Sequence, residues 1–116
     1  MEIRLIVIRT AEPEKLAEFY SWLGLEFEYH KHGNSPYHYA AMVGSMTLEI
    51  YPLTKSQVEA DKYLRLGFAI DEFETKLELL KSKGLLINEP VSTEFGYMTV
   101  ISDLDGRKIE LYKKHS

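Results

Sequence analysis

Cysteine is absent from the 116 residues of this chain. The absence excludes disulfide bonds, thiolate metal ligands and cysteine nucleophiles, and a cytoplasmic location is the expected one. The sequence also has no apolar run of about 18 residues, so no membrane-spanning helix is predicted. Acidic and basic residues are interspersed, the net charge is −4, and no basic stripe is present that could bind phosphates. We therefore expect neither a membrane nor a nucleic acid as a partner.

The familiar motifs of catalysis are missing as well. The sequence has no G-x-S-x-G turn for a serine nucleophile, no glycine-rich phosphate loop and no dinucleotide-binding fingerprint. Its composition is that of an ordinary globular protein, with 45% hydrophobic residues, and its length is sufficient for one domain with a buried core. Function must therefore be inferred from polar residues placed on the predicted helices and strands.

The predicted elements occur twice in the same order. An alternating strand at 2–10 precedes a helix within 11–24, which has an apolar stripe at helical spacing, and three strands follow. The second half repeats this order, with its helix within 71–84. We predict an α+β fold of two βαβββ modules that form one curved mixed sheet, with the helices on its convex face. The single domain has these predicted parts: module 1 at about 1–53, a connector at 54–61, and module 2 at about 62–116.

Each module ends on a strand with a glutamate in its middle. Glu49 and Glu110 lie 61 residues apart, each between two aliphatic residues and each followed two residues later by a tyrosine, Tyr51 or Tyr112. Because side chains alternate along a strand, the aliphatic residues should pack under the helices and the glutamates should point to the opposite, concave face. Converging carboxylates need a metal, a proton or a basic side chain as their counter-charge. The alternative for each glutamate taken alone is a solvated sheet face.

Three stretches of the chain resemble one family. They are "AEPEKLAEFYSWLGLEF", "FAIDEFETKLELLKSKG" and "SDLDGRKIELY", and the last has the pattern D-x-D-G-x-x-x-E-L. The chain resembles the vicinal oxygen chelate superfamily, the group of glyoxalase, bleomycin-resistance and extradiol dioxygenase proteins. The resemblance extends over nearly the whole chain. It implies the fold predicted above but no particular activity, because this fold supports many activities.

The resemblance also implies where a metal would bind. Metal-dependent members hold the ion with two histidines and two glutamates, and the glutamates correspond to Glu49 and Glu110. The first-strand histidine position falls on Leu5, or on Arg4 if the register shifts, and the fifth-strand position falls on Arg65. Leucine has no donor atom, arginine stays protonated, and zinc, nickel, iron or manganese needs at least three good protein ligands. We expect a metal-free site in which Arg65 neutralises both glutamates; the alternative places Arg65 in water at the sheet edge.

Two further kinds of residue are candidates for ligand binding. Arg9 shares a strand face with Leu5, so it could bind a carboxylate or phosphate through two hydrogen bonds, or it could be an exposed arginine at a strand end. Tyr51 and Tyr112 share the faces of their glutamates and could stack on a flat ligand.

For His30, His32 and His38, the sequence leaves more than one role open. His38 could be a general base or a displaced metal ligand, and a hydrogen-bonded histidine on the sheet is the alternative. His30 and His32 have the spacing of ligands on one strand face, but the turn residues that follow favour surface exposure. His115 lies in the predicted tail.

Two functions remain open, and the sequence does not decide whether the protein is an enzyme. The first is a module that binds a small organic ligand in the concave cavity, contacted by Arg65, Arg9, His38, Tyr51 and Tyr112, with no cofactor. The second is a divalent-metal-dependent lyase, isomerase or dioxygenase, in which Glu49 and Glu110 are catalytic residues or metal ligands assisted by His38 and water. A closed interaction domain is a third alternative, and a homodimer is expected in each case.

Overall fold

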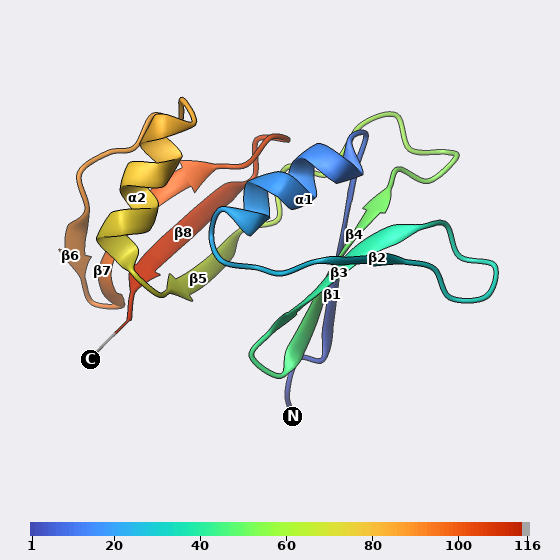
Figure 1. Ribbon diagram of the computed structural model, residues 1–116, viewed down its shortest axis with the longest axis horizontal. Coiled ribbons are helices and arrows are strands. Elements are labelled where there is room, and N and C mark those ends of the chain that lie inside the picture. The colour runs from blue at the N-terminus through green and yellow to red at the C-terminus, as the bar shows by residue number, and fades with distance from the viewer. Residues whose placement is uncertain (115–116) are drawn as a thin grey trace. The chain divides into compact units, whose positions relative to one another are not determined.

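The computed structural model describes residues 1–114 (Figure 1), and His115 lies outside the described residues. The chain divides into two compact units, which are described separately below. The first unit consists of Met1–Ser21 and Leu25–Asp61, and the second consists of Trp22–Gly24 and the chain from Lys62 onward. Among the described residues, no helix is long and apolar enough to cross a membrane.

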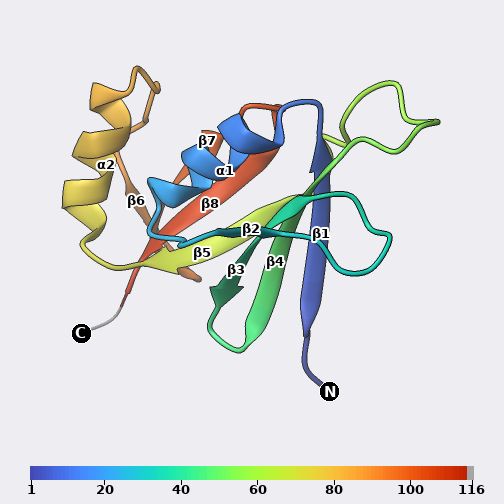
Figure 2. The ribbon, with the colours of Figure 1, turned by 45° about the vertical axis from the view of Figure 1, so that its right-hand side comes forward.

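The first unit has the predicted βαβββ order. Its sheet has the strand order β1-β4-β3-β2, in which β1 is parallel to β4 and the other neighbours are antiparallel. Figure 2 shows β3 and β4 joined by a tight turn. The elements are β1 (Leu5–Thr10), α1 (Pro13–Ser21), β2 (Glu28–His30), β3 (His38–Val43) and β4 (Met46–Pro52).

Helix α1 covers one face of this sheet. Pro13 is its first residue, where the missing N–H costs nothing because the helix has no acceptor for it there. The apolar stripe of α1, which includes Leu16 and Phe19, is buried, and the helix packs on β4. Leu48 and Ile50 of β4 are completely buried. Their burial fixes the direction of β4, so the residues between them point to the other face of the sheet.

The second unit repeats this topology. Its sheet has the order β5-β8-β7-β6, with β5 parallel to β8 and the other neighbours antiparallel. Helix α2 buries Phe73, Leu77 and Leu80, and β8 buries Ile109 and Leu111 completely. The elements are β5 (Leu66–Ile70), α2 (Phe73–Ser82), β6 (Val91–Thr93), β7 (Gly96–Ser102) and β8 (Lys108–Lys113).

The second unit also includes three residues from the end of the first helical segment. Trp22 lies within cation–π range of Lys83, whose Nζ is 5.4 Å from the indole centroid. Gly24 approaches the side chain of Lys76 so closely that a Cβ there would lie 3.0 Å from Nζ. These contacts tie Trp22–Gly24 to the neighbourhood of α2.

The turn between β7 and β8 is held by a buried ion cluster. Oδ1 of Asp103 accepts hydrogen bonds from the backbone N–H groups of Asp105 and Arg107, at 2.8 and 3.1 Å. Nη1 of Arg107 donates to Oδ2 of Asp103 at 3.2 Å and to Oδ2 of Asp105 at 2.8 Å. The Arg107 side chain is 1% exposed and that of Asp103 is fully buried. The D-x-D-G pattern therefore orients the strand that carries Glu110.

Candidate functional site

The sheet face opposite α1 carries the polar residues of the first unit. Strand pairing sets Val7 beside Glu49 and Arg9 beside Tyr51, and it sets Ala40 beside Glu49. Paired residues point to the same face of a sheet, so Arg9, Glu49 and Tyr51 share one face, away from the buried aliphatic residues of β4. The predicted direction of this glutamate within its own sheet agrees with the pairing.

His38 of β3 points to the same face and is completely buried. Its Nδ1 lies 3.1 Å from the carbonyl oxygen of Pro36. Because a carbonyl oxygen can only accept, Nδ1 carries the hydrogen and donates it. The opposite nitrogen, Nε2, lies 3.3 Å from Oε2 of Glu49, but it makes no hydrogen bond within residues 1–114. These two atoms are therefore close, but their geometry is not that of a hydrogen bond.

Two more imidazoles lie beside His38. His30 pairs with His38 across β2 and β3, and their ring centroids are 4.7 Å apart. His32 follows on the connecting turn, with its ring 4.6 Å from that of His30 and 5.4 Å from that of His38. One ring nitrogen of each histidine and one oxygen of Glu49 all lie within 4.8 Å of one another. The expected surface exposure holds for His32, whereas His30 is half-buried.

Tyr51 and Arg9 border this group. The ring of Tyr51 stacks on that of His38, with centroids 4.2 Å apart and an interplanar angle of 8°. Cζ of Arg9 lies 4.9 Å from the centroid of the Tyr51 ring, and its Nη1 donates to the carbonyl oxygen of Pro52 at 3.0 Å. Three of the predicted ligand-binding residues, Arg9, His38 and Tyr51, are thus brought together on one sheet.

The second unit has a different arrangement around its glutamate. Nε of Arg65 donates to Oε2 of Glu110 at 2.6 Å, and the hydroxyl of Tyr112 donates to Oε1 at 2.5 Å. Both carboxylate oxygens are therefore engaged. The hydroxyl of Tyr112, and then the guanidinium of Arg65, hold the pKa of Glu110 below its ordinary value, and the same bond raises the pKa of Tyr112. Arg65 does pair with a glutamate, as predicted; its pairing with Glu49 stays a prediction.

Gly67 makes room for this arrangement. It pairs with Glu110 across β5 and β8, and a Cβ there would lie 3.4 Å from the Tyr112 ring and 3.6 Å from Cβ of Glu110. The absence of a side chain allows the tyrosine to lie over β5, from where its hydroxyl reaches the carboxylate.

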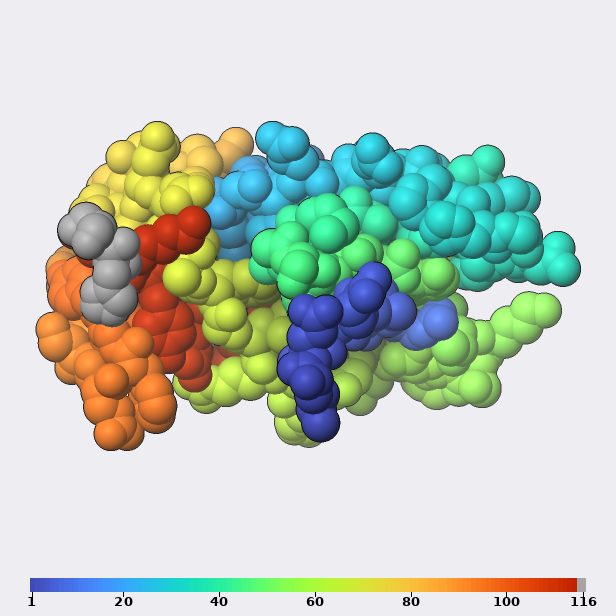
Figure 3. Space-filling view, turned by 90° about the horizontal axis from the view of Figure 1, so that it is seen from below, coloured from blue at the N-terminus to red at the C-terminus, as the bar shows by residue number. Residues whose placement is uncertain are grey.

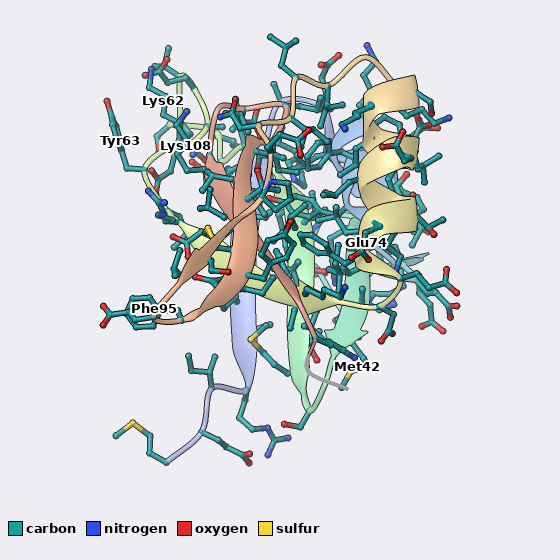
Figure 4. All side chains as sticks on the ribbon, turned by 90° about the vertical axis from the view of Figure 1, so that its left-hand side faces the viewer. Met42, Lys62, Tyr63, Glu74, Phe95 and Lys108 are labelled. Atoms are coloured by element: carbon teal, nitrogen blue, oxygen red, sulfur yellow. The ribbon has the colours of Figure 1, made fainter. Side chains whose placement is uncertain are left out.

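A shallow depression lies next to Arg65. It has a volume of about 330 Å³ and is lined by Lys62, Tyr63, Arg65, Gly106 and Lys108. Figure 4 shows the side chains of Lys62, Tyr63 and Lys108 gathered at the same end of the unit. The lining includes three cationic side chains and an aromatic ring, which suits a small anion with a flat apolar part.

The residues present do not fit the metal site that the resemblance implies. Leu5, at the first-strand position, is more than half exposed and offers no donor atom, and Figure 3 shows the N-terminal residues, in blue, on the molecular surface. Arg65 at the fifth-strand position is bonded to Glu110, which would itself have to be a ligand. The usual set of two histidines and two glutamates cannot form from these residues.

No protein-family model matches this sequence, and no curated protein matches it. Solved structures match it over nearly its whole length. An antibiotic binding protein from a Streptomyces species is 19% identical, with a TM-score of 0.75, over 99% of this chain and 97% of that one. A possible glyoxalase from Bacillus cereus is 21% identical, with a TM-score of 0.67, over 97% and 98%. A lactoylglutathione lyase from Agrobacterium tumefaciens is 14% identical, with a TM-score of 0.69, over 97% and 92%.

These likenesses, together with the repeated βαβββ topology, confirm the predicted α+β fold, although hydrogen bonds join its strands into two four-stranded sheets and not into the one sheet expected. The chain has a fold of the glyoxalase/bleomycin-resistance type. Because the identities are low, they bear on the fold and leave the ligand to be inferred from the residues of this chain.

Proposed function

We propose that this protein binds a small organic anion and does so without the metal site that is usual for its fold. One observation carries the proposal: both oxygens of the Glu110 carboxylate are engaged by Arg65 and Tyr112. A metal at the usual position would have to displace a charge-assisted hydrogen bond and a short hydroxyl bond while gaining few other ligands. The arrangement instead supports an organic ligand that is held by the same basic and aromatic residues.

The charge of the depression indicates which ligands are suitable. The Arg65 side chain is 54% exposed, and it lines the depression together with Lys62 and Lys108. A guanidinium bound to one carboxylate through Nε has further N–H donors on its terminal nitrogens, which can bind a carboxylate or phosphate of the ligand. In the first unit, the ligand contacts expected from Arg9, His38 and Tyr51 stay predictions.

The proposal is tested by binding measurements on protein treated with a chelator. A panel of small aromatic carboxylates and phosphates is screened by thermal shift, and compounds that bind are measured by calorimetry with and without chelator. We expect affinities that do not depend on the chelator, and a loss of about 10–100-fold in Arg65→Gln, since a hydrogen bond to a charged group contributes about 1.5–3 kcal/mol. Arg4→Gln is the matched control, because Arg4 is an exposed arginine that does not line the depression. Equal losses in both variants, or binding that disappears with the chelator and returns with a metal, would contradict the proposal.

A metal-dependent lyase, isomerase or dioxygenase is the second candidate. The group of three imidazoles around Glu49 favours it, since imidazole and carboxylate are the ligands of zinc and iron in many enzymes. In that case Glu49 would be a metal ligand, and a carboxylate would move the proton. Activity on a hemithioacetal or a catechol that is lost with chelator would support this function over the first.

A further inference from the structure

The first unit contains a group of metal-binding side chains that differs from the usual site of the fold. We propose that His30, His32, His38 and Glu49 bind one Zn²⁺ ion. Only Glu49 coincides with a usual ligand position; the three histidines come from β2, β3 and the turn between them. The inference does not depend on the proposed function, because the site is in one unit and uses neither Arg65 nor Glu110.

His38 is already oriented as a ligand. Its Nδ1–H donates to the carbonyl oxygen of Pro36, so in the neutral imidazole the lone pair is on Nε2. A histidine that binds a metal almost always donates its other N–H in this way, which fixes the ring and the tautomer. Nε2 is buried, faces Glu49 and has no hydrogen-bond partner within residues 1–114. A metal ion would satisfy this nitrogen.

His30 presents a second nitrogen of the same kind. Its Nε2 is also buried and without a hydrogen-bond partner in the described part of the chain. Its other nitrogen, Nδ1, lies 3.9 Å from a carboxylate oxygen of Glu28. That carboxylate is positioned to become the outer partner of a metal-bound imidazole with a small movement. Without a metal, two buried nitrogens on neighbouring strands have no hydrogen-bond partner among residues 1–114, which is unfavourable for buried polar atoms.

The turn after β2 brings in the third imidazole. The backbone N–H of His32 donates to Oγ of Ser35 at 2.9 Å, and the N–H of Ser35 donates back to the carbonyl oxygen of His32 at 2.9 Å. These two bonds close the turn and hold the ring of His32 beside those of His30 and His38. Because His32 is exposed, its side chain can adjust without disturbing the core.

The spacing of the four groups is close to that of a tetrahedral zinc site. Zn–N and Zn–O bonds of about 2.0–2.1 Å place neighbouring ligand atoms about 3.3–3.4 Å apart. Nε2 of His38 and Oε2 of Glu49 are already 3.3 Å apart, and no pair among the four groups exceeds 4.8 Å. Closure therefore requires these atoms to approach one another by about 1.5 Å or less. Three imidazoles and one carboxylate favour zinc over magnesium or calcium, which prefer oxygen ligands.

The test is a metal titration of the full-length protein after removal of metals with a chelator. Calorimetry with Zn²⁺ should give one ion per chain, and Co²⁺ should give the strong visible absorption of tetrahedral coordination. His32→Asn and Glu49→Gln should each weaken zinc binding by at least about 10–100-fold, the range that outer partners alone contribute. Glu26→Gln is the matched control for Glu49, since Glu26 is an exposed glutamate outside the group, and it should bind zinc like the unmodified protein.

One more variant determines where the ion binds. Glu110→Gln removes the second glutamate of the usual site, and we expect it to leave the affinity for Zn²⁺ unchanged. Failure to bind zinc, binding that persists in both His32→Asn and Glu49→Gln, or binding that is lost in Glu110→Gln would overturn the inference. Circular dichroism of each variant confirms that it is folded. Since the titration uses the metal alone, its failure is separate from any failure to find an organic ligand.

Discussion

Replacing Asp103 by alanine should destabilise the second unit severely. The substitution removes a buried partner of Arg107 and two hydrogen bonds to backbone N–H groups, at 2.8 and 3.1 Å. Asp105 stays beside the guanidinium, but the backbone N–H groups of Asp105 and Arg107 lose their acceptor and Arg107 loses its fully buried partner, so we expect a total loss of about 3–5 kcal/mol. Since a domain of this size is stable by about 5–15 kcal/mol, the loss is a large part of the total.

Asp105 provides the comparison within the same cluster. Its side chain is 17% exposed and accepts a bond from Arg107 at 2.8 Å, but it does not accept the two backbone bonds of the turn. Asp105→Ala leaves Asp103 in place beside the guanidinium, so we expect a smaller loss of about 1–2 kcal/mol.

Urea unfolding measures both losses. Trp22, the single tryptophan, belongs to the same unit as the cluster, so its fluorescence follows the relevant transition, and circular dichroism follows the whole chain. The reasoning is refuted if Asp103→Ala loses less than about 1 kcal/mol, or if the two alanine variants lose equal amounts.

Two further predictions concern Glu110 and the core. The pKa of Glu110 is below its usual value of 4.5, so its stabilising effect is complete above that pH and is lost as the pH falls through the lowered pKa. Urea unfolding measures the free energy of unfolding of the unmodified protein and of Tyr112→Phe. The difference between the two should be larger at pH 7 than at about pH 3. Equal differences at the two pH values would contradict the hydrogen bond from Tyr112 as the cause of the lowered pKa of Glu110. Leu48→Ala should cost about 2–5 kcal/mol in thermal or urea unfolding, because Leu48 is completely buried, whereas Leu104→Ala, at a half-exposed position, should cost about 0.5 kcal/mol or less.

The fold could be predicted from the sequence because its periodicities are clear. Strict alternation around Glu49 and Glu110 predicts strands with one apolar face, and the structure buries Leu48 and Ile109 completely on that face. Helical spacing of apolar residues predicts both helices, and Pro13 begins the first as expected. Where local pattern and tertiary burial agree, a single sequence is sufficient.

One strand was predicted in the wrong place. In the second half, the apolar run at 85–91 predicts a short strand that is broken at Pro90, but β6 is Val91–Thr93, and the segment before Pro90 is not a strand. Pro90 has no N–H to donate, and the residues after it pair with β7 instead. A short apolar run does not show which of its residues have a partner strand.

The site was predicted in part. The resemblance identified Glu110 and Arg65, and their ion pair is present. The grouping of His30 and His32 around His38 was missed, although the H-x-H spacing was a signal. Finding it requires the register of β2 against β3, and the closed turn between them, which alternation within one strand does not determine. The homodimer and the cytoplasmic location stay predictions.

Trp22–Gly24 precede the connector in the sequence but belong to the second unit. This has a consequence for the synthesis of the protein and for its cleavage by a protease. A ribosome synthesises these three residues well before Lys62, so the second unit cannot close until the later part of the chain has emerged. Cleavage within the connector would leave the indole that Lys83 contacts on one fragment and Lys83 on the other. The repeat that is evident in the sequence therefore does not yield two separable halves, because the C-terminal fragment would lack three residues of its own unit.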